Sequence, residues 1–321
     1  MTTASSQQAR PALTLRWGGP VGVPGQMRAR NRLRRALPYL LLAPTFGVLG
    51  VLVAYPVADE AYLSFTRTTF IQPQSRFVGL ANYASVLGSG VFWQVLLNTL
   101  IWTAAVVAFQ FVVGMAAALV LVRRFVGRGV LRALVLLPWV TPGVIVGMVW
   151  KLMYDPYLGF VDEFLGLFGV GHHVAVLANP STALIGVIVA AIWKGFPLSA
   201  LLYMAAYQSV SAELLEAARV DGAGSWRRFV HVTLPQMAPT VRITVLLTTV
   251  WTFNYFDLVY IMTGGGPVND TQIFPTYIYQ QAFTNIDYGT AATYGVIAVL
   301  VLAVFTVVYL RQLRRGGVFS R

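Results

Sequence analysis

The sequence contains no cysteine and unusually few charged residues. Without cysteine, the chain cannot form disulfide bonds, thiolate metal sites or a thiol nucleophile. Only 11% of its 321 residues are charged, whereas soluble domains carry roughly 25%. So little charge cannot cover a water-facing surface, and the hydrophobic residues, 57% of the chain, occur in long blocks. The composition therefore predicts a membrane protein.

Six apolar blocks have about the length that a membrane-spanning helix requires. Such a helix needs roughly 20 residues, because each adds about 1.5 Å across a hydrocarbon core about 30 Å thick. We predict an all-α, polytopic bundle of six transmembrane helices at residues 37–57, 93–122, 133–150, 182–207, 243–262 and 288–310. Residues 1–36 are predicted to be a basic, disordered cytoplasmic tail, and residues 37–321 to form one six-span domain.

The basic residues indicate the orientation of these spans. Nineteen of the 23 lie in the two tails and in the connections that follow the second and fourth spans. The others are Arg67, Arg76, Lys151 and Lys194. By the positive-inside rule, both termini are predicted to be cytoplasmic. This distribution also explains the net charge of +12, so we predict no binding to nucleic acid.

The connection between the fourth and fifth predicted spans carries a specific motif. It reads Glu-Leu-Leu-Glu-Ala-Ala from Glu213, reaches Asp221-Gly222, and ends nine residues later with Val232-Thr-Leu-Pro235. This resembles the EAA signature of ABC importer permeases, from which only Val232 departs, replacing isoleucine. The resemblance implies a type I ABC importer transmembrane domain, a multi-pass permease subunit in the bacterial plasma (inner) membrane.

Two further segments resemble the sugar-type branch of this family, similar to the maltose and glycerol-phosphate permeases. They are Trp193-Lys194 with Pro197, and the turn Thr263-Gly-Gly-Gly-Pro267. The resemblance implies import of a sugar or oligosaccharide delivered by an extracytoplasmic binding protein. Glycerol 3-phosphate or another polar solute is the alternative cargo.

The same resemblance implies the partners of this chain. They are a second homologous permease subunit, which shares the lipid bilayer, and two ATPase subunits, or a homodimer of them, which dock on the cytoplasmic side. The sequence lacks the Gly-x-x-x-x-Gly-Lys-Ser/Thr pattern of a phosphate-binding loop. ATP and Mg²⁺ are therefore expected on the ATPase subunits, and no cofactor, metal or catalytic residue is expected in this chain.

The EAA segment, about residues 208–240, is predicted to be a helix–turn–helix that couples the permease to the ATPase. Ser211 and Ser225 are suited to cap its two helices, Gly222 to adopt a left-handed conformation, and Pro235 to end the second helix before the fifth span. An ordinary amphipathic interfacial loop is the alternative. The predicted coupling residues are Glu213, Glu216, Ala217, Ala218, Asp221, Gly222, Leu234 and Pro235.

Lys194 and Asp257 lie within predicted spans, where an ionisable residue commonly faces a cavity or a partner. Counting from the cytoplasmic ends of their helices places them at depths of roughly 20 and 24 Å, toward the outer half of the membrane. Snorkelling of both side chains to the outer interface is the alternative. The predicted substrate path comprises Trp193, Lys194, Asn254, Tyr255 and Asp257, with the rings of Trp251 and Phe256 nearby.

Other patterns favour structural roles. Adjacent histidines such as His172-His173 point in different directions, so this pair, with Asp162 and Glu163 upstream, is predicted to belong to a solvated loop rather than a metal site. Gly143-x-x-x-Gly147 is typical of close helix packing. A secondary transporter would need coupling ions and often has repeated halves, and a membrane enzyme would need a nucleophile or metal cluster. We find neither pattern.

Overall fold

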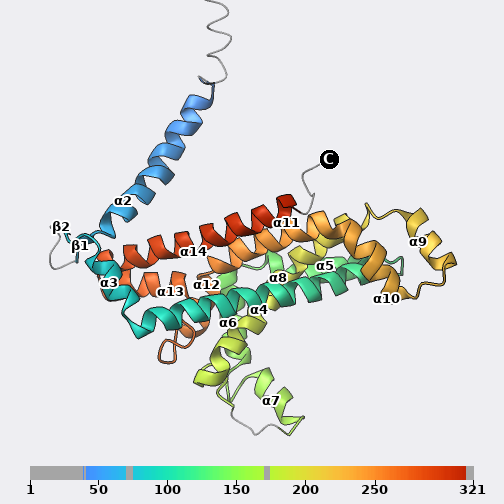
Figure 1. Ribbon diagram of the computed structural model, residues 1–321. Helices are drawn as coiled ribbons and strands as arrows, with labels where there is room; N and C mark the ends of the chain where they lie inside the picture. The colour runs from blue at the N-terminus through green and yellow to red at the C-terminus, as the bar shows by residue number, and fades with distance from the viewer. Residues whose placement is uncertain (1–38, 40, 70–74, 170–173, 316–321) are drawn as a thin grey trace, which may run out of the picture. The chain divides into compact units, whose positions relative to one another are not determined.

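The computed structural model describes residue 39 and residues 41–69, 75–169 and 174–315, and within these ranges it is mainly helical (Figure 1). The tail predicted at residues 1–36 and the His172-His173 pair lie outside them. The chain divides into two compact units, residues 1–58 and 59–321. The boundary between a tail and one domain at residue 36 stays a prediction.

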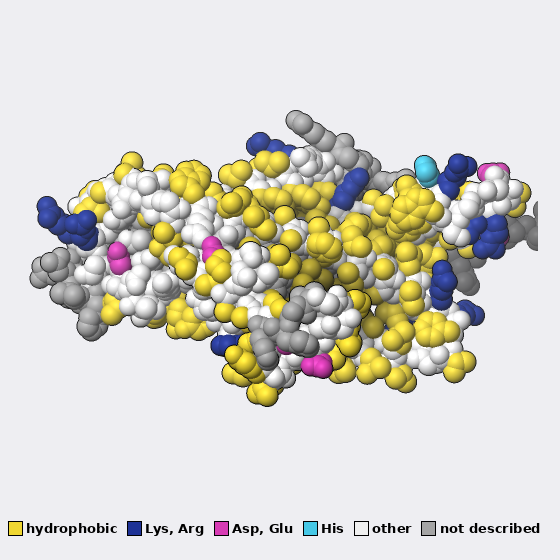
Figure 2. Space-filling view, turned by 90° about the horizontal axis from the view of Figure 1, so that it is seen from below, with side chains coloured by type: hydrophobic (Ala, Val, Ile, Leu, Met, Phe, Trp, Pro, Cys, Tyr) yellow, Lys and Arg dark blue, Asp and Glu magenta, His cyan; other side chains and the backbone are white. Residues whose placement is uncertain are grey.

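Four helices are long and apolar enough to cross a membrane: Leu41–Leu63, Gly90–Leu121 (α4), Pro180–Tyr207 (α8) and Tyr288–Arg314, nearly all of α14 (Tyr288–Arg315). Two bent pairs also pass this test, Arg128–Val140 (α5) with Gly143–Met153 (α6), and Ser225–Phe253 with Asp257–Thr263 (α12). With each pair counted as one span, the described chain has the predicted six. Hydrophobic side chains accordingly dominate the face shown in Figure 2.

The first unit is described at residue 39 and from residue 41 to 58, and it is helical from residue 41 onward. It includes a π-helical stretch, η1 (Gly50–Ala54), and the start of α2 (Tyr55–Leu63). Every described residue of this unit is exposed. Because these side chains are mostly apolar, lipid or another protein must cover them.

Helices α4 and α8 pack closely at the centre of the second unit because small residues lie where the two helices meet. A Cβ added to Gly114 of α4 would lie only 2.7 Å from Cβ of Ser199 on α8. A Cβ on Gly195 of α8 would overlap the Gln110 amide of α4. The two glycines therefore set a backbone approach that larger residues would prevent.

Short elements cluster at the end of the bundle where α14 begins (Figure 1). Strands β1 (Thr66–Arg67) and β2 (Arg76–Phe77) pair antiparallel, with Thr66 opposite Phe77. Helix α3 (Ala81–Leu87) contacts α14, and α13 (Phe274–Tyr279) with η3 (Gln280–Thr284) leads into α14. Helix α7 (Phe160–Gly166) follows α6.

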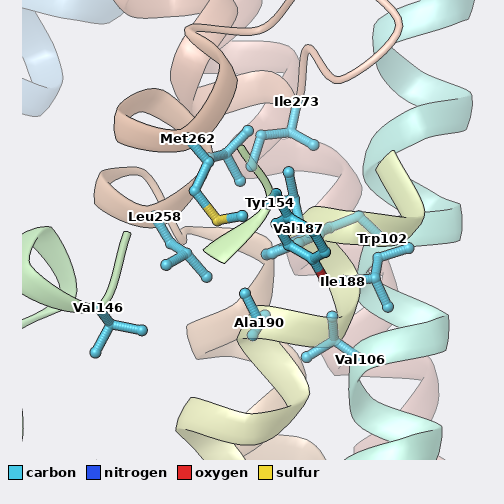
Figure 3. Packing of buried hydrophobic residues seen from close by; sticks show 12 residues of the cluster. Trp102, Val106, Val146, Tyr154, Val187, Ile188, Ala190, Leu258, Met262 and Ile273 are labelled. Carbon is cyan, nitrogen blue, oxygen red and sulfur yellow. The ribbon is translucent and has the colours of Figure 1, made fainter. Parts of the chain in front are cut away.

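Three clusters of buried side chains hold the bundle together. The largest joins α4, α6, α8 and α12 around Trp102, Val187 and Leu258 (Figure 3). A second includes Phe92, Phe274 and Tyr294, and a third Met115, Tyr203 and Met237. Since each cluster draws on several helices, the apolar residues inside the bundle fix how the spans pack.

The third span is not the single helix predicted at residues 133–150. It breaks at Thr141-Pro142, and α5 and α6 meet at 96°. Thr141 has the extended conformation (φ −67°, ψ 132°) that a residue before proline prefers, and Pro142 cannot donate a helical hydrogen bond. Residues 133–150 are continuously apolar, but they change direction at this step.

The prediction that Pro235 ends a helix before the fifth span is wrong. Helix α10 (Ser225–Arg228), the π-helical stretch η2 (Phe229–Thr233) and α11 (Leu234–Phe253) form one continuous helix. Pro235 directly follows the π-helical stretch, where the hydrogen-bond register of the helix changes, and its missing backbone N–H does not end the helix. The helix that contains the fifth span thus begins at Ser225, well before the predicted residue 243.

Candidate functional site

The EAA segment forms the predicted helical hairpin. Helix α9 (Ala212–Val220) begins at Ser211, whose Oγ accepts a hydrogen bond from the Leu214 amide at 3.4 Å. It ends at Gly222, which has φ of +77°, and the Ala223 amide donates to the Ala218 carbonyl at 2.9 Å. The Ser211 cap and the left-handed Gly222 are confirmed. Ser225, however, is the first residue of α10, and Gly224 is its cap.

The hairpin exposes acidic and apolar side chains together. Glu213, Glu216, Ala217 and Asp221 are exposed, whereas Ala218 is half-buried. Of the apolar side chains, Leu214, Val220 and Trp226 are 53%, 87% and 75% exposed. Exposed large apolar side chains beside charged ones fit a surface that contacts another protein.

The hairpin is attached firmly to the rest of the bundle. The Gln236 side chain of α11 accepts a hydrogen bond from the Ser211 amide at 3.0 Å, which joins the start of α9 to α11. Arg228 donates to the Ala223 carbonyl at 3.0 Å. Phe229 and the predicted coupling residue Leu234 pack against the third buried cluster, while Pro235 is exposed. A displacement of the hairpin would therefore move α11.

A cavity of about 150 Å³ lies between α4, α5, α8 and α11. Its polar and aromatic lining is Trp102, Gln110, Trp139, Lys194, Thr248, Trp251, Thr252 and Tyr255. Two hydrogen bonds fix the wall: Trp102 Nε1 donates to the Thr252 carbonyl at 2.9 Å, and Gln110 Nε2 to the Ala191 carbonyl at 3.1 Å. Aromatic faces with a few polar groups are typical of a small-molecule site.

Lys194 lies near the middle of α8, at the break of the third span. Its Nζ donates to the Thr141 carbonyl at 2.7 Å, at the C-terminus of α5. The last carbonyls of a helix carry partial negative charge, so a cation is stabilised there. The hydrogen bond inside the bundle argues against snorkelling.

Asp257 lies at helix N-termini, whereas Lys194 lies at a helix C-terminus. Its Oδ1 accepts a hydrogen bond from the Leu258 amide at 3.0 Å in the first turn of α12, and its carboxylate lies against Gly143, the first residue of α6. Helix N-termini stabilise negative charge. Asp257 and Lys194 interact electrostatically, but among the described residues no hydrogen bond or salt bridge joins them. Each charge is therefore held at a helix terminus.

The structure brings together four of the five residues predicted for the substrate path. Lys194 and Tyr255 line the cavity, and Asn254, Tyr255 and Asp257 line an adjoining, shallower hollow of about 520 Å³. Trp251 lines both. Trp193 lines neither; it is exposed and contacts Trp150 edge to face at 5.8 Å.

Sequence reasoning missed Gln110, Trp139 and Thr248, which come from α4, α5 and α11. Gln110 is the one amide side chain between residues 99 and 122 of this apolar block, and that was a usable signal, because polar side chains inside a membrane need a partner. No spacing in the sequence relates these three residues to one another.

The packing prediction for Gly143 and Gly147 is confirmed. A Cβ on Gly143 would overlap the Asp257 carboxylate, and one on Gly147 would lie 3.0 Å from Ile261 of α12. In the part of the chain that the structure describes, no group of three residues is placed to hold a metal ion. Asp162, predicted to lie in a solvated loop, is buried and accepts a hydrogen bond from the Val174 amide at 2.8 Å.

Comparisons with known proteins agree with this architecture. A family model described as "Binding-protein-dependent transport system inner membrane component" matches residues 110–315. The trehalose/maltose transport system permease protein MalF of Thermococcus litoralis is 34% identical over 276 residues, 86% of this chain and 92% of that protein. The inner membrane ABC transporter permease protein YcjO of Escherichia coli is 37% identical over 296 residues, 88% of this chain and 97% of that protein.

A solved structure shares the fold. The crystal structure of a bacterial ABC transporter involved in the import of the acidic polysaccharide alginate contains a chain with a TM-score of 0.77, 23% sequence identity and coverage of 90% of this chain and 99% of that chain. The predicted fold, that of an ABC importer transmembrane domain, is thereby confirmed. From the family match over residues 110–315 and from these relatives, the chain belongs to the inner membrane permease components of binding-protein-dependent ABC transport systems.

Proposed function

We propose that this permease imports a sugar or oligosaccharide that an extracytoplasmic binding protein delivers. Its relative from Thermococcus litoralis is named for trehalose and maltose transport. The cavity chemistry is compatible with such cargo, because Trp139, Trp251 and Tyr255 offer ring faces and Gln110 offers an amide. Lys194 adds a cation, which favours glycerol 3-phosphate as the second candidate.

The proposed complex contains a second homologous permease subunit and two ATPase subunits, which bind ATP and Mg²⁺. The α9–α10 hairpin docks into a cleft on the ATPase from the cytoplasmic side. One observation carries this part of the proposal: the continuous helix Ser225–Phe253 begins in the hairpin and ends with Thr248, Trp251 and Thr252 on the cavity wall. Movement of the hairpin would thus change the cavity, as alternating access requires.

The test is uptake into proteoliposomes that hold the permease with its second permease, ATPase and binding-protein partners. We expect ATP-dependent accumulation of radiolabelled trehalose or maltose. Trp251→Ala should lower uptake roughly two- to twelvefold, as about 0.5–1.5 kcal/mol per aromatic contact implies. Trp193→Ala, which removes an exposed tryptophan outside the cavity, is the matched control.

Each part of the proposal can fail separately. Accumulation of glycerol 3-phosphate but of neither disaccharide would show that glycerol 3-phosphate, and not a sugar, is the cargo. Equal effects of Trp251→Ala and Trp193→Ala would remove the cavity from the solute path. Uptake at the full rate without the ATPase subunits would identify a secondary transporter and overturn the coupling mechanism.

A further inference from the structure

A second hollow lies on the surface of the bundle and plays no part in the proposed transport path. It has a volume of about 440 Å³ and is enclosed by α4, α11 and α14. Its walls are mainly aliphatic and aromatic, with Val107 and Phe111 of α4, Val245 and Phe253 of α11, and Val301 of α14. Leu100 and Phe305 at its rim are exposed. We refer to it as the α4–α11–α14 groove.

One end of the groove is polar. Tyr309 lines the groove there, and its hydroxyl donates to the Arg242 carbonyl at 2.8 Å. Arg242 precedes Val245 by three residues, so the two side chains share one face of the helix. Because Tyr309 lines the groove and contacts the Arg242 backbone directly, Arg242 lies beside this end of the groove.

The Arg242 guanidinium is incompletely paired. Arg242 is half-buried, and among the described residues its side chain has no hydrogen bond or salt bridge. A partly desolvated cation is unfavourable unless an anion and hydrogen-bond acceptors compensate it. Phosphate oxygens suit a guanidinium well, because its N–H groups can donate to two of them at once.

This end of the groove lies beside residues that are typical of the end of a membrane span. Arg242 directly precedes the apolar part of α11, and Tyr309 precedes Arg311 and Arg314 at the end of α14. Arginine and tyrosine at the ends of spans are typical of the membrane interface. Basic pockets between transmembrane helices bind anionic lipid headgroups.

We propose that an anionic phospholipid binds in the α4–α11–α14 groove, with one acyl chain along the apolar wall and its phosphate on Arg242. A transmembrane helix of a partner subunit could cover the same apolar wall. It would leave the guanidinium without an anion unless it carried a carboxylate at this depth, whereas a lipid supplies both parts in one molecule.

The experiment uses the assembled transporter in nanodiscs that contain either phosphatidylglycerol or phosphatidylcholine with the same photoreactive acyl chain. Labelled peptides are mapped by mass spectrometry. In the wild-type protein, phosphatidylglycerol should label α4 and α14 at the groove about fivefold more than phosphatidylcholine, which corresponds to about 1 kcal/mol for one basic side chain near an anionic surface. Arg242→Gln should abolish this preference.

Arg311→Gln is the matched control, because Arg311 is exposed at the end of α14 and does not line the groove. It should leave the preference intact. Val107→Trp, which fills the groove, should lower labelling by both lipids in complexes that retain all subunits. Equal labelling by the two lipids, equal losses in Arg242→Gln and Arg311→Gln, or cross-linking of the groove to a partner helix would each overturn the proposal. Since labelling is the readout, failure here leaves the proposed cargo and coupling unaffected.

Discussion

Substitution of Gly222 tests whether the shape of the hairpin matters for coupling. Gly222 has φ of +77° after α9, and a Cβ added there would meet no atom within 4 Å. Gly222→Val therefore introduces backbone strain without a steric clash, of about 1–2 kcal/mol. That free energy lowers the ratio of native to non-native turn roughly 5- to 30-fold, which sets the upper limit of the loss in function.

The assay combines membrane insertion, recovery of the ATPase subunits with tagged permease, and ATP-driven uptake. Gly222→Val should insert normally but lower ATPase recovery and uptake by a factor up to that limit. Gly224→Val is the matched control, because Gly224 also has open space for a Cβ but an extended backbone, with φ of −63°. Gly222→Asn should restore much of the activity, because asparagine tolerates the left-handed conformation.

The relative transport activities of the three variants test the strain argument. If Gly222→Val assembles and transports as well as Gly224→Val, the turn geometry does not determine coupling. If Gly222→Asn is as inactive as Gly222→Val, the defect comes from the added side chain and not from the backbone, and the strain argument is wrong.

Three further predictions follow from the spans and their breaks. Reporter fusions at residues 75 and 315 should report opposite sides of the membrane, and the same side for both would refute the predicted topology. Lys194→Ala should lower the stability of the detergent-solubilised protein by about 1.5–3 kcal/mol, because it removes a charged hydrogen bond at the end of α5. In a thermal-unfolding assay, the exposed Lys151→Ala should have little effect, and equal shifts would contradict this role. Gly143→Val should destabilise by about 1–3 kcal/mol through overlap with Asp257, whereas Gly129→Val, with open space around it, should be neutral in the same assay.

The rules for helix capping and for glycine turns predicted the hairpin well, because they involve only neighbouring residues. The Ser211 cap and the Gly222 turn depend on backbone groups only a few positions away, so their chemistry is visible in the sequence. The rule that proline ends a helix failed at Pro235, because the helix continues through the π-helical stretch that directly precedes this residue and changes the hydrogen-bond register. Hydropathy likewise failed to report the bend at Thr141-Pro142, since it measures polarity and not direction.

Composition and short, fixed spacings in the sequence were enough to predict a membrane-spanning chain, its family and the loop that carries the EAA motif. The surroundings of Lys194 and Asp257 could not be predicted in this way, because they depend on how distant spans pack together. Lys194 donates a hydrogen bond to the Thr141 carbonyl, which is 53 residues away in the sequence, and Asp257 lies against Gly143. Both partners exist because a span breaks inside the bundle and exposes helix termini whose partial charges stabilise ions away from water.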